Sequence, residues 1–462
     1  MDIIIQQIAE KISKSINTNF LELLKEGTEI SDFIININST LDEIGVTITQ
    51  EVLETLDLLI KDDINRKKRW EVKSKAAPKT LNTIFGQVKY KRTYYKNKKN
   101  GEYRYLSDEK VGIRPGDKMD TGLKSRLIEE AVDSPYRKSG KKATENIELS
   151  GQTVMNSIRE LGAVANNKVE IKEKGREVTT LYIEADEDHV ALQSGKCAEP
   201  KLVYVHEGRK KAGKNRYKLQ NVRVFSGMYS NSEDLWLEVA DYLEEAYDTE
   251  KIEKIYLSGD GASWIKQGKS WINKSIYVLD RFHLSKYVKV ATAHKAPLAE
   301  PLWKYINKLE QENVRELLDI IIEDTEKGTK REAVKNAKRY IMNNWEGIKN
   351  QYNKDYPGCS AEGHVSHILS SRLSSRPLGW SVVGVDEMSR LRAYKANGGK
   401  VYDLLKEKRK KELKEERILE LSNKSVNRII SRHAAERLGN ITILETGKRT
   451  WTREMLKSFR GA

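Results

Sequence analysis

Cysteine is scarce in this sequence of 462 residues, which contains only Cys197 and Cys359. Two cysteines cannot supply a disulfide framework, and a chain of this length buries enough surface to fold without one. Eight prolines and 29 glycines exclude a collagen-like or linker-dominated chain. No run approaches the ~20 apolar residues of a membrane span, and the start lacks an export signal. We therefore expect a soluble cytoplasmic protein with about three domains of ~150 residues each.

Negative charge is nearly absent from one stretch. The chain has 83 Lys and Arg against 68 Asp and Glu, a formal net charge of +15. Between Arg66 and Arg104, 14 basic residues are opposed only by Glu71 and Glu102. A chain-wide bias toward lysine would not concentrate charge in this way. The distribution therefore indicates a polyanionic partner.

The N-terminal part of the sequence predicts helices followed by a basic hairpin. Residues 1–65 carry apolar residues at helical spacing, which favours packing or self-association. Residues 66–118 include alternating strand-like runs, with NKKNGE as the expected turn. Lysines and tyrosines in such a hairpin suit a nucleic-acid backbone, although lysines also protect sheet edges. The residues expected at DNA are Arg66, Lys67, Lys68, Arg69, Lys89, Lys91 and Arg92.

Residues 119–170 are expected to be helical, with a break at IELSG. Ser150 is the expected N-cap of a helix from Gln152 to Leu161. A helix, a short turn with glycine and a second helix are typical of a helix-turn-helix, and an ordinary pair of packed helices is the alternative. Four side chains of the second helix suit bases or phosphates: Gln152, Thr153, Asn156 and Arg159.

The rest of the chain predicts a sheet and then helices. In residues 178–283 we expect three strands, a helix, a strand, a short helix and a last strand, which together indicate a mixed sheet covered by helices. Residues 284–358 and 359–400 are expected to be helical, and the tail at 401–462 begins as a charged helix. The fold class is therefore multidomain α+β.

Two aspartates follow predicted buried strands. Asp186 ends TTLYIEAD and Asp260 ends KIEKIYLSGD, and carboxylates at the ends of neighbouring strands meet at one crevice. Such carboxylates hold Mg²⁺, with Mn²⁺ as the alternative, and paired ions activate the nucleophile and stabilise the leaving oxygen of a phosphodiester. Each aspartate is alternatively a cap on the next element. Glu184 shares a strand face with Asp186 and is its rival as the first acid.

A further segment makes the pattern resemble a known family. In VLDRFHLSKYV, Asp280 and His283 lie three apart at the start of a helix. With YIEADEDHVALQ, YLSGDGASWIK and CSAEGHVSHILSSRLSSRPLGWS, this order resembles DDE-type bacterial insertion-sequence transposases of the Mutator-related and ISLre type. The resemblance runs from the basic hairpin to about Gly399. It implies a ribonuclease H-like core in two parts, 178–283 and 359–400, separated by the helical insertion at 284–358.

The resemblance also implies an activity and its residues. Such a transposase binds the terminal inverted repeats of its element and target DNA as a homodimer or larger oligomer at the nucleoid, and it cleaves and joins DNA strands. Asp186, Asp260 and Glu362 would be the catalytic metal ligands, with Glu387 as a rival third acid. Asp280 and His283 would support the site without binding the metal.

Several alternatives stay open. Arg372, Arg376 and Trp380 are expected at a phosphate or an unstacked base, and burial of Trp380 in a core is the alternative. Zinc at the set Cys359, His364 and His367 is disfavoured, because structural zinc sites usually pair their ligands. The sequence has no P-loop and no serine-nucleophile motif. The other functions are a DNA-binding protein that has lost catalysis, and a carbohydrate hydrolase, against which the basic hairpin argues.

Overall fold

The chain is a mixed α+β protein. A computed structural model describes residues 2–214, 216–376, 379–415 and 451. Internal contacts divide the chain into two units, Met1–Tyr402 and Asp403–Ala462. Of the predicted helical tail, residues 401–415 are helical, and 416–450 and 452–462 lie outside the described residues. No helix in the described ranges is long and apolar enough to cross a membrane.

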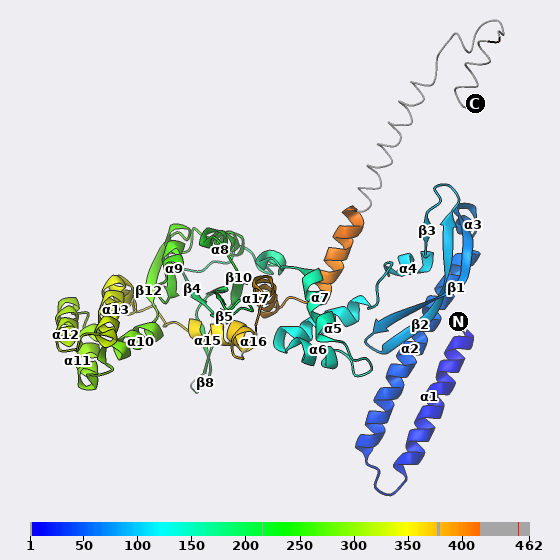
Figure 1. Ribbon diagram of the computed structural model, residues 1–462, viewed down its shortest axis with the longest axis horizontal. Helices are drawn as coiled ribbons and strands as arrows, with labels where there is room; N and C mark the ends of the chain where they lie inside the picture. The colour runs from blue at the N-terminus through cyan, green and yellow to red at the C-terminus, as the bar shows by residue number, and fades with distance from the viewer. Residues whose placement is uncertain (1, 215, 377–378, 416–450, 452–462) are drawn as a thin grey trace. The chain divides into compact units, whose positions relative to one another are not determined.

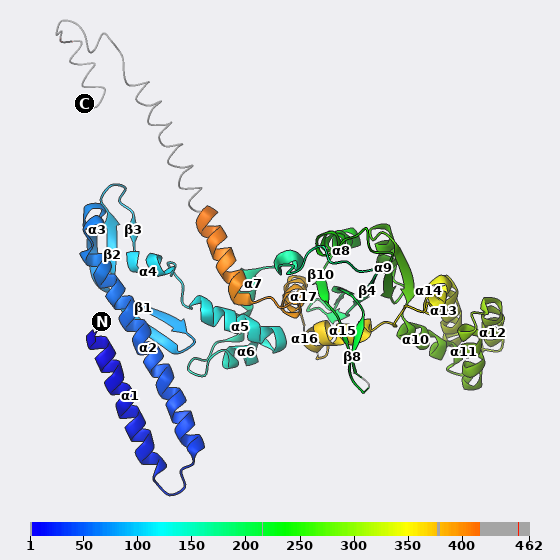
Figure 2. The same ribbon diagram turned by 180° about the vertical axis from the view of Figure 1, so that it is seen from behind.

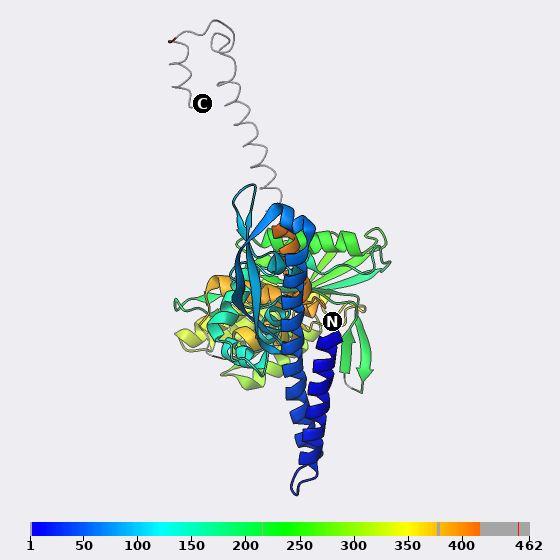
Figure 3. The same ribbon diagram turned by 90° about the vertical axis from the view of Figure 1, so that its right-hand side faces the viewer.

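The N-terminal region combines a helical hairpin with a three-stranded antiparallel sheet, order β1-β2-β3 (Figures 1 and 2). The two long helices α1 and α2 lie side by side in all three views (Figure 3). The buried carboxylate of Asp57 joins α2 to β2, because it accepts hydrogen bonds from the backbone and hydroxyl of Thr93 at 3.0 and 2.6 Å. The elements are α1 (Asp2–Leu23), α2 (Ile30–Asp62), α3 (Ile64–Arg69), β1 (Trp70–Thr83), β2 (Gly86–Asn97) and β3 (Tyr103–Arg104).

The predicted basic hairpin is present, but its turn was misplaced. The β1–β2 turn is formed by Ile84 and Phe85, and the NKKNGE segment joins β2 to the short β3 instead. Gly86, at φ +133°, closes the β1–β2 turn, and the hydroxyl of Thr83 donates to its carbonyl at 2.9 Å. The apolar turn escaped notice because Phe85 packs on Gly45 of α2, a long-range contact that turn statistics do not contain.

A group of short helices follows. Ser150 caps α7 as predicted, its hydroxyl accepting the Thr153 N–H at 3.1 Å. The backbones of α6 and of the segment before α7 approach closely, because a Cβ on Gly140 would lie 2.0 Å from the Leu149 carbonyl oxygen. The elements are α4 (Leu106–Val111), α5 (Thr121–Asp133), α6 (Tyr136–Lys142), α7 (Gly151–Leu161) and η1 (Asn166–Lys168).

A five-stranded mixed sheet forms the centre of the next region, in the order β10-β7-β4-β11-β12. β7 is antiparallel to both of its neighbours, whereas β4, β11 and β12 are mutually parallel. The predicted mixed sheet is therefore confirmed. Its strands are β4 (Thr180–Glu187), β7 (Lys201–His206), β10 (Arg223–Gly227), β11 (Lys254–Gly259) and β12 (Ser275–Leu279). Two small hairpins pair β5 (Val190–Ala191) with β6 (Cys197–Ala198), and β8 (Arg209–Gly213) with β9 (Arg216–Leu219).

Helices complete this region (Figure 1). α8 contributes Trp236 and Val239 to the core that also contains Leu181 and Ile183 of β4. The expected all-helical insertion follows β12, and it joins the same core through Val314 and other side chains. The helices are α8 (Ser232–Ala246), α9 (Ser263–Gln267), η2 (Gly268–Ser270), α10 (Arg281–Thr292), η3 (Ala296–Leu298), α11 (Ala299–Asn307), α12 (Gln311–Glu323), α13 (Thr329–Asn343), α14 (Trp345–Asn350), α15 (Ala361–Val365), η4 (Ser366–Ser370), α16 (Ser371–Leu373) and α17 (Val382–Ala396).

Candidate functional site

The segment from residue 355 to residue 374 runs along one face of β4. At one end, the hydroxyl of Tyr182 donates to the Asp355 carbonyl at 2.8 Å. At the other end, the hydroxyl of Ser374 lies 2.9 Å from both carboxylate oxygens of Asp188. Residues 182, 184 and 186 alternate along β4 and so share this face, and Asp188 lies one residue beyond the end of the strand. The segment is therefore aligned with β4, and it carries α15 past the predicted first acid.

Three side chains meet at this point. Single ligand atoms of Asp186, His283 and Glu362 all lie within 4.8 Å of one another. Asp186 is 7% exposed, whereas the Glu362 side chain in the first turn of α15 is 56% exposed. His283 Nε2 lies 4.0 Å from the Glu362 carboxylate and is buried, and no described residue forms a hydrogen bond with it.

This donor set fits a divalent metal ion. A buried ring nitrogen without a protein partner is expected where a ligand completes its bonding. Carboxylates suit Mg²⁺ and Mn²⁺, and an imidazole adds preference for the transition metal, so the mixed set favours Mn²⁺. His283 was expected to support the site without binding metal. Its spacing from Asp280 indicated proximity, but only the fold shows that the ring turns toward Asp186 and Glu362.

Asp260 and Asp280 add negative charge around this group. Burial raises the pKa of Asp186 to about 7, and the nearby carboxylates of Asp260, Glu362 and Asp280 raise it as well. Burial also raises the pKa of Asp280. Asp260 and Asp280 directly follow the carboxyl ends of the adjacent strands β11 and β12. The carboxylate of each accepts the backbone N–H two residues further on, at 2.8 Å for Asp260 and 3.1 Å for Asp280. Asp260 is therefore both a turn cap and a neighbour of Asp186, although it is not a member of the three-residue group.

Glu184, the rival first acid, is fully occupied by protein donors. Its buried carboxylate accepts the hydroxyl of Tyr204 and the backbone N–H of Ser360. His206 Nδ1 accepts the Gly208 N–H at 3.1 Å, so Nε2 carries the proton that it donates to Glu184 at 3.1 Å. Burial raises the pKa of Glu184, but these hydrogen bonds outweigh it, and the pKa falls to about 2. Glu184 therefore anchors the segment that carries α15, and it has little capacity left for a metal.

Glu387, the rival third acid, lies elsewhere. It is buried on α17 and pairs with Arg159 of α7 at 2.5 Å. Arg159 was predicted to contact DNA, but it also donates to the hydroxyl of Ser381 at 2.6 Å. The guanidinium is therefore used to hold α7 against α17. The remaining residues expected to read DNA from α7 stay at its surface: Gln152 and Asn156 are exposed and bonded to each other at 2.8 Å, and Thr153 is half-buried.

Two of the residues expected to follow Glu362 at DNA are buried. The Arg372 guanidinium contacts the rings of Tyr136 and Trp380, 5.2 and 4.8 Å from their centroids, and donates to the Ala131 carbonyl at 2.9 Å. The indole N–H of Trp380 donates to the Leu373 carbonyl at 3.0 Å. Burial lowers the pKa of Arg372 to about 10. The expectation of DNA contact is corrected for this pair, which forms a structural stack, whereas Arg376 is exposed.

The three side chains of the disfavoured zinc set have separate surroundings. The thiol of Cys359 donates to Glu184 at 3.3 Å, and burial raises its pKa well above the usual range. The ring of His364 stacks on Tyr204, with centroids 4.3 Å apart. His367 is exposed.

The basic residues of the N-terminal region divide into two groups. Arg92 forms an ion pair with the buried Asp108 and lies over the Tyr105 ring at 3.5 Å. Arg66 donates to three backbone carbonyls, including that of Trp70 at 3.3 Å. These two arginines are structural, which corrects their prediction as DNA contacts. The other members of the predicted set are exposed: Lys67, Lys68, Arg69, Lys89 and Lys91.

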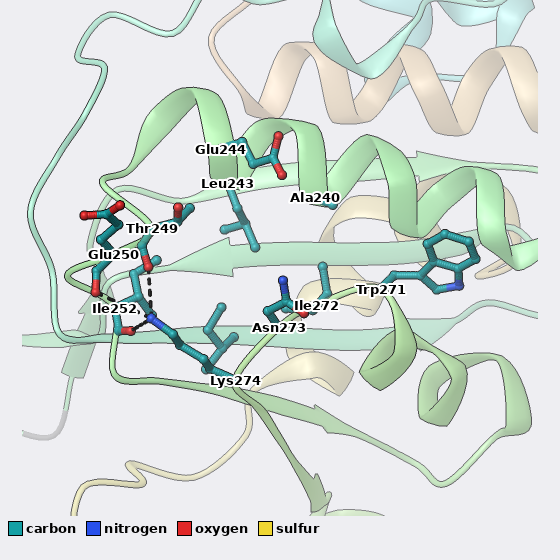
Figure 4. Close-up of a pocket in the computed structure, with 11 residues that line it drawn as sticks. Ala240, Leu243, Glu244, Thr249, Glu250, Ile252, Trp271, Ile272, Asn273 and Lys274 are labelled. Carbon is teal, nitrogen blue, oxygen red and sulfur yellow. Dashed lines mark hydrogen bonds between the residues drawn. The ribbon is translucent and has the colours of Figure 1, made fainter.

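A separate cavity of about 290 Å³ lies at the far end of β11 from Asp260 (Figure 4). It is lined by Leu243, Ile252 and Trp271 among others, and Lys274 crosses beside it. The Lys274 ammonium donates to the carbonyls of Thr249 and Ile252 at 3.1 and 2.5 Å, which fixes the loop before the strand. The cavity is thus separate from the group of Asp186, His283 and Glu362, called the acidic group below.

Comparison with known proteins places the chain in a family. The model of the Uncharacterised protein family (UPF0236) matches residues 23–411. The chain belongs to UPF0236. A UPF0236 protein of Caldanaerobacter subterraneus subsp. tengcongensis that carries four locus names is 43% identical over 467 residues, covering 100% of this chain and 98% of the relative.

Two further UPF0236 relatives extend the comparison. Another protein of the same organism, with eleven locus names, is 42% identical over 464 residues, covering 100% of this chain and 98% of the relative. The "UPF0236 protein in vanSb 3'region" of Streptococcus gallolyticus is 26% identical over 404 residues, which is 83% of this chain and 87% of that protein.

Proposed function

We propose that this chain is a DDE-type DNA transposase that binds the ends of an insertion sequence, cleaves DNA strands and joins them to a target. The observation that carries the proposal is the group of Asp186, His283 and Glu362 beside two further strand-end aspartates. Concentrated carboxylates in a crevice at the carboxyl ends of parallel strands suit metal-dependent phosphodiester chemistry.

The sheet supports a ribonuclease H-like core. Three sequential strands form an antiparallel run, β10-β7-β4, and two parallel strands follow on the other side of β4. The resemblance implies a first acid on the central strand, a second after the parallel neighbour of that strand, and a third on a helix beyond a helical insertion. The acids of this chain match that order. The order of the acids is an analogy between folds, whereas the proposed chemistry depends on the acidic side chains themselves.

The relatives' names add support of another kind. One UPF0236 name covers eleven loci of a single genome, and another covers four. Many loci under one protein name in a single genome are what a self-copying DNA element would produce. An ordinary enzyme or regulator has no physical reason to be present in this number.

Within this function, Asp186 and Glu362 would hold the metal ion, with His283 as a third donor. Bound ions would activate the attacking water or 3′-hydroxyl and stabilise the leaving oxygen. Asp260 would keep the turn after β11 in place and add negative charge that favours cation binding. Glu184 would fix α15, and with it Glu362, against β4.

The proposed partner is double-stranded DNA, which would place the protein at the nucleoid. The exposed lysines near the β1–β2 sheet and the surface of α7 are the candidates for contact with inverted repeats. A non-catalytic DNA-binding protein would use the same surfaces, but it would have no use for a carboxylate–imidazole group with an unpartnered nitrogen.

We also infer self-association through α1 and α2. Nine exposed apolar side chains offer on the order of 900 Å² per chain, comparable to the about 800 Å² that each partner buries in a standard interface. Such a surface is larger than most monomers expose, and it suits a second copy of the same hairpin. The side chains are Ile12, Ile16, Phe20, Ile30, Ile34, Leu41, Ile48, Val52 and Leu59.

The test is a strand-cleavage assay with the full chain. Duplex oligonucleotides bearing the DNA that flanks the gene are incubated with Mn²⁺ or Mg²⁺, and nicked and joined products are resolved on denaturing gels. We expect Asp186→Asn and Glu362→Gln to reduce both products by orders of magnitude, because the charge that holds the cation is lost. Glu346→Gln, at an 81% exposed carboxylate on α14, is the matched control. Wild-type activity in the first two variants would refute the assignment.

A further inference from the structure

The hairpin formed by β8 and β9 carries an unusual charge. Residues 209–219 contain six basic residues and no acidic one. Lys210, Lys211, Lys214 and Lys218 are exposed, and the ring of Tyr217 is 64% exposed. The hairpin extends away from the sheet in Figures 1 and 2. It is a second basic surface, distant in sequence from the basic stretch at residues 66–104.

The pairing of the two strands is unfavourable in isolation. Lys210 lies directly opposite Lys218, and like charges at such positions destabilise an antiparallel pair. On the next pair, Lys211 lies opposite Tyr217. A hairpin maintained for its own stability would place an acid across from a lysine. Charge of one sign on both strands instead suits binding to a polyanion, which would relieve the repulsion.

The base of the hairpin is fixed to the segment that carries Glu362. The guanidinium of Arg209 donates to the carbonyls of Pro357 and Gly358 at 3.0 and 2.7 Å, and it lies 3.8 Å from the Glu184 carboxylate. The Gln220 N–H donates to the Gly208 carbonyl and the Glu207 N–H donates to the Gln220 carbonyl, each at 3.0 Å, so the hairpin is closed at the same level. The lysines are therefore attached to the segment that holds the third acid.

The register of the sheet gives the spacing to the acidic group. The hairpin follows His206, whose partner on β4 is Tyr182, four residues before Asp186. At about 3.3 Å per residue, the base of the hairpin lies ~13 Å along the strand from Asp186. One strand of duplex DNA advances 3.4 Å per nucleotide, so this span corresponds to roughly four nucleotides.

We propose that the β8–β9 hairpin is a nucleic-acid binding site. It would hold the phosphates of a DNA strand, beginning about four nucleotides from the phosphodiester bond that lies at the group of Asp186, His283 and Glu362. Lysines 210, 211, 214 and 218 would contact phosphate oxygens, and Tyr217 would stack on a sugar or base. This inference rests on the proposed function for the identity of the polymer, and it adds a phosphate-binding element that is independent of the metal ligands.

The experiment measures binding of duplex DNA to the full chain in EDTA. We compare the double variant Lys210→Glu with Lys211→Glu against a control double variant, Lys327→Glu with Lys330→Glu. The control makes the same charge change at two exposed lysines, one between α12 and α13 and one in the first turn of α13. We expect the hairpin variant to lose at least about tenfold more affinity than the control and to lower the salt slope by about two. In the hairpin variant, ethylation of phosphates should interfere with binding less than it does in the wild type, starting at the fourth nucleotide from the bond at the Asp186 group.

The outcomes separate the two proposals. Equal affinity of the hairpin variant and the control, with wild-type interference in both, would overturn the hairpin site even if the protein cleaves DNA. Hairpin-dependent binding without metal-dependent cleavage would support the site and refute the transposase. Absence of any DNA binding by the wild type would refute both. The interference pattern and an unchanged melting temperature distinguish lost contacts from lost folding.

Discussion

At the scale of single residues, two acids of β4 have opposite environments. Glu184 is surrounded by donors, which hold its pKa near 2, whereas Asp186 faces other carboxylates, and burial raises its pKa to about 7. The first arrangement stabilises a charge and the second accumulates repulsion. Burial together with repulsion of this kind is what a bound cation would relieve, and this contrast is the basis of the proposal that Asp186 is a ligand and Glu184 a structural acid.

Matched neutral variants test this distinction in metal-free buffer at neutral pH. Glu184→Gln should lower the free energy of unfolding by about 2–4 kcal/mol, because the amide leaves buried donors without an acceptor. Asp186→Asn should leave it unchanged or raise it, because the repulsion among carboxylates is reduced. Chemical denaturation monitored by tryptophan fluorescence measures both. Equal destabilisation by the two variants would contradict the assignment of separate roles.

Strand alternation was enough to place Glu184 and Asp186 on one face, but it could not choose between them. The choice depends on Tyr204 of the neighbouring strand and on Ser360, which the helical insertion separates from β4 in sequence. The fate of Arg372 is similar, because its stacking partner Tyr136 belongs to a different helix far away in the chain. Local patterns carry residue type and face, whereas partners of this kind come only from the tertiary fold.

At the scale of elements, the strands of the sheet were predictable because apolar runs bounded by turn residues are strong signals. The β8–β9 hairpin was missed, although the run Gly-Lys-Asn at the centre of GRKKAGKNRYK was a turn signal for it. The β1–β2 turn was misplaced because the packing of Phe85 on Gly45, a contact between distant parts of the chain, helps Gly86 to define it.

The close approach of α6 to the segment before α7 gives a prediction about the stability of this pair of helices. Gly140→Ala should lower the free energy of unfolding by at least about 2 kcal/mol, because the new Cβ meets the Leu149 carbonyl, a backbone atom that cannot rotate away. Gly363→Ala in α15 is the control, since no atom lies within 4 Å of its Cβ position. Thermal and denaturant unfolding of both variants decide the point. A stable Gly140→Ala protein would contradict the predicted clash.

The apolar face of the helical hairpin gives a second prediction at this scale. Ile34→Lys with Leu41→Lys should convert the full chain to a monomer, because charges would enter the buried centre of the interface. Asn36→Lys with Ser39→Lys adds equal charge at exposed positions turned well away from the apolar row of α2, and it should leave the oligomer intact. Light scattering after size exclusion gives the masses. A monomeric wild type at micromolar concentration would overturn the inference.

At the scale of the whole molecule, the group of Asp186, His283 and Glu362 joins three separated parts of the chain, so an ion bound there should stabilise the fold. We expect Mn²⁺ at millimolar concentration to raise the melting temperature by a few degrees, because a ligand that binds only the native state stabilises it by mass action. Mg²⁺ should give a smaller rise, since the imidazole favours the transition metal. Differential scanning fluorimetry, with EDTA as reference, measures the shift.

The control for this prediction is Glu362→Gln, which removes one carboxylate at an exposed position and should abolish most of the Mn²⁺ shift. Glu346→Gln should retain it. A shift that survives in Glu362→Gln at full size would show that the ion binds elsewhere in the protein.

The two ends of the helical insertion have a consequence for how this protein can change. The chain leaves the sheet at Asp280, and it returns where Asp355 receives the hydroxyl of Tyr182. The helices between these two points also fill the core of the sheet, through Val314 and other side chains. Changes that leave Glu362 in its place beside Asp186 are therefore confined to the outer faces of these helices. Substitutions on those outer faces can therefore alter this surface of the molecule, generation after generation, without rebuilding the group of Asp186, His283 and Glu362.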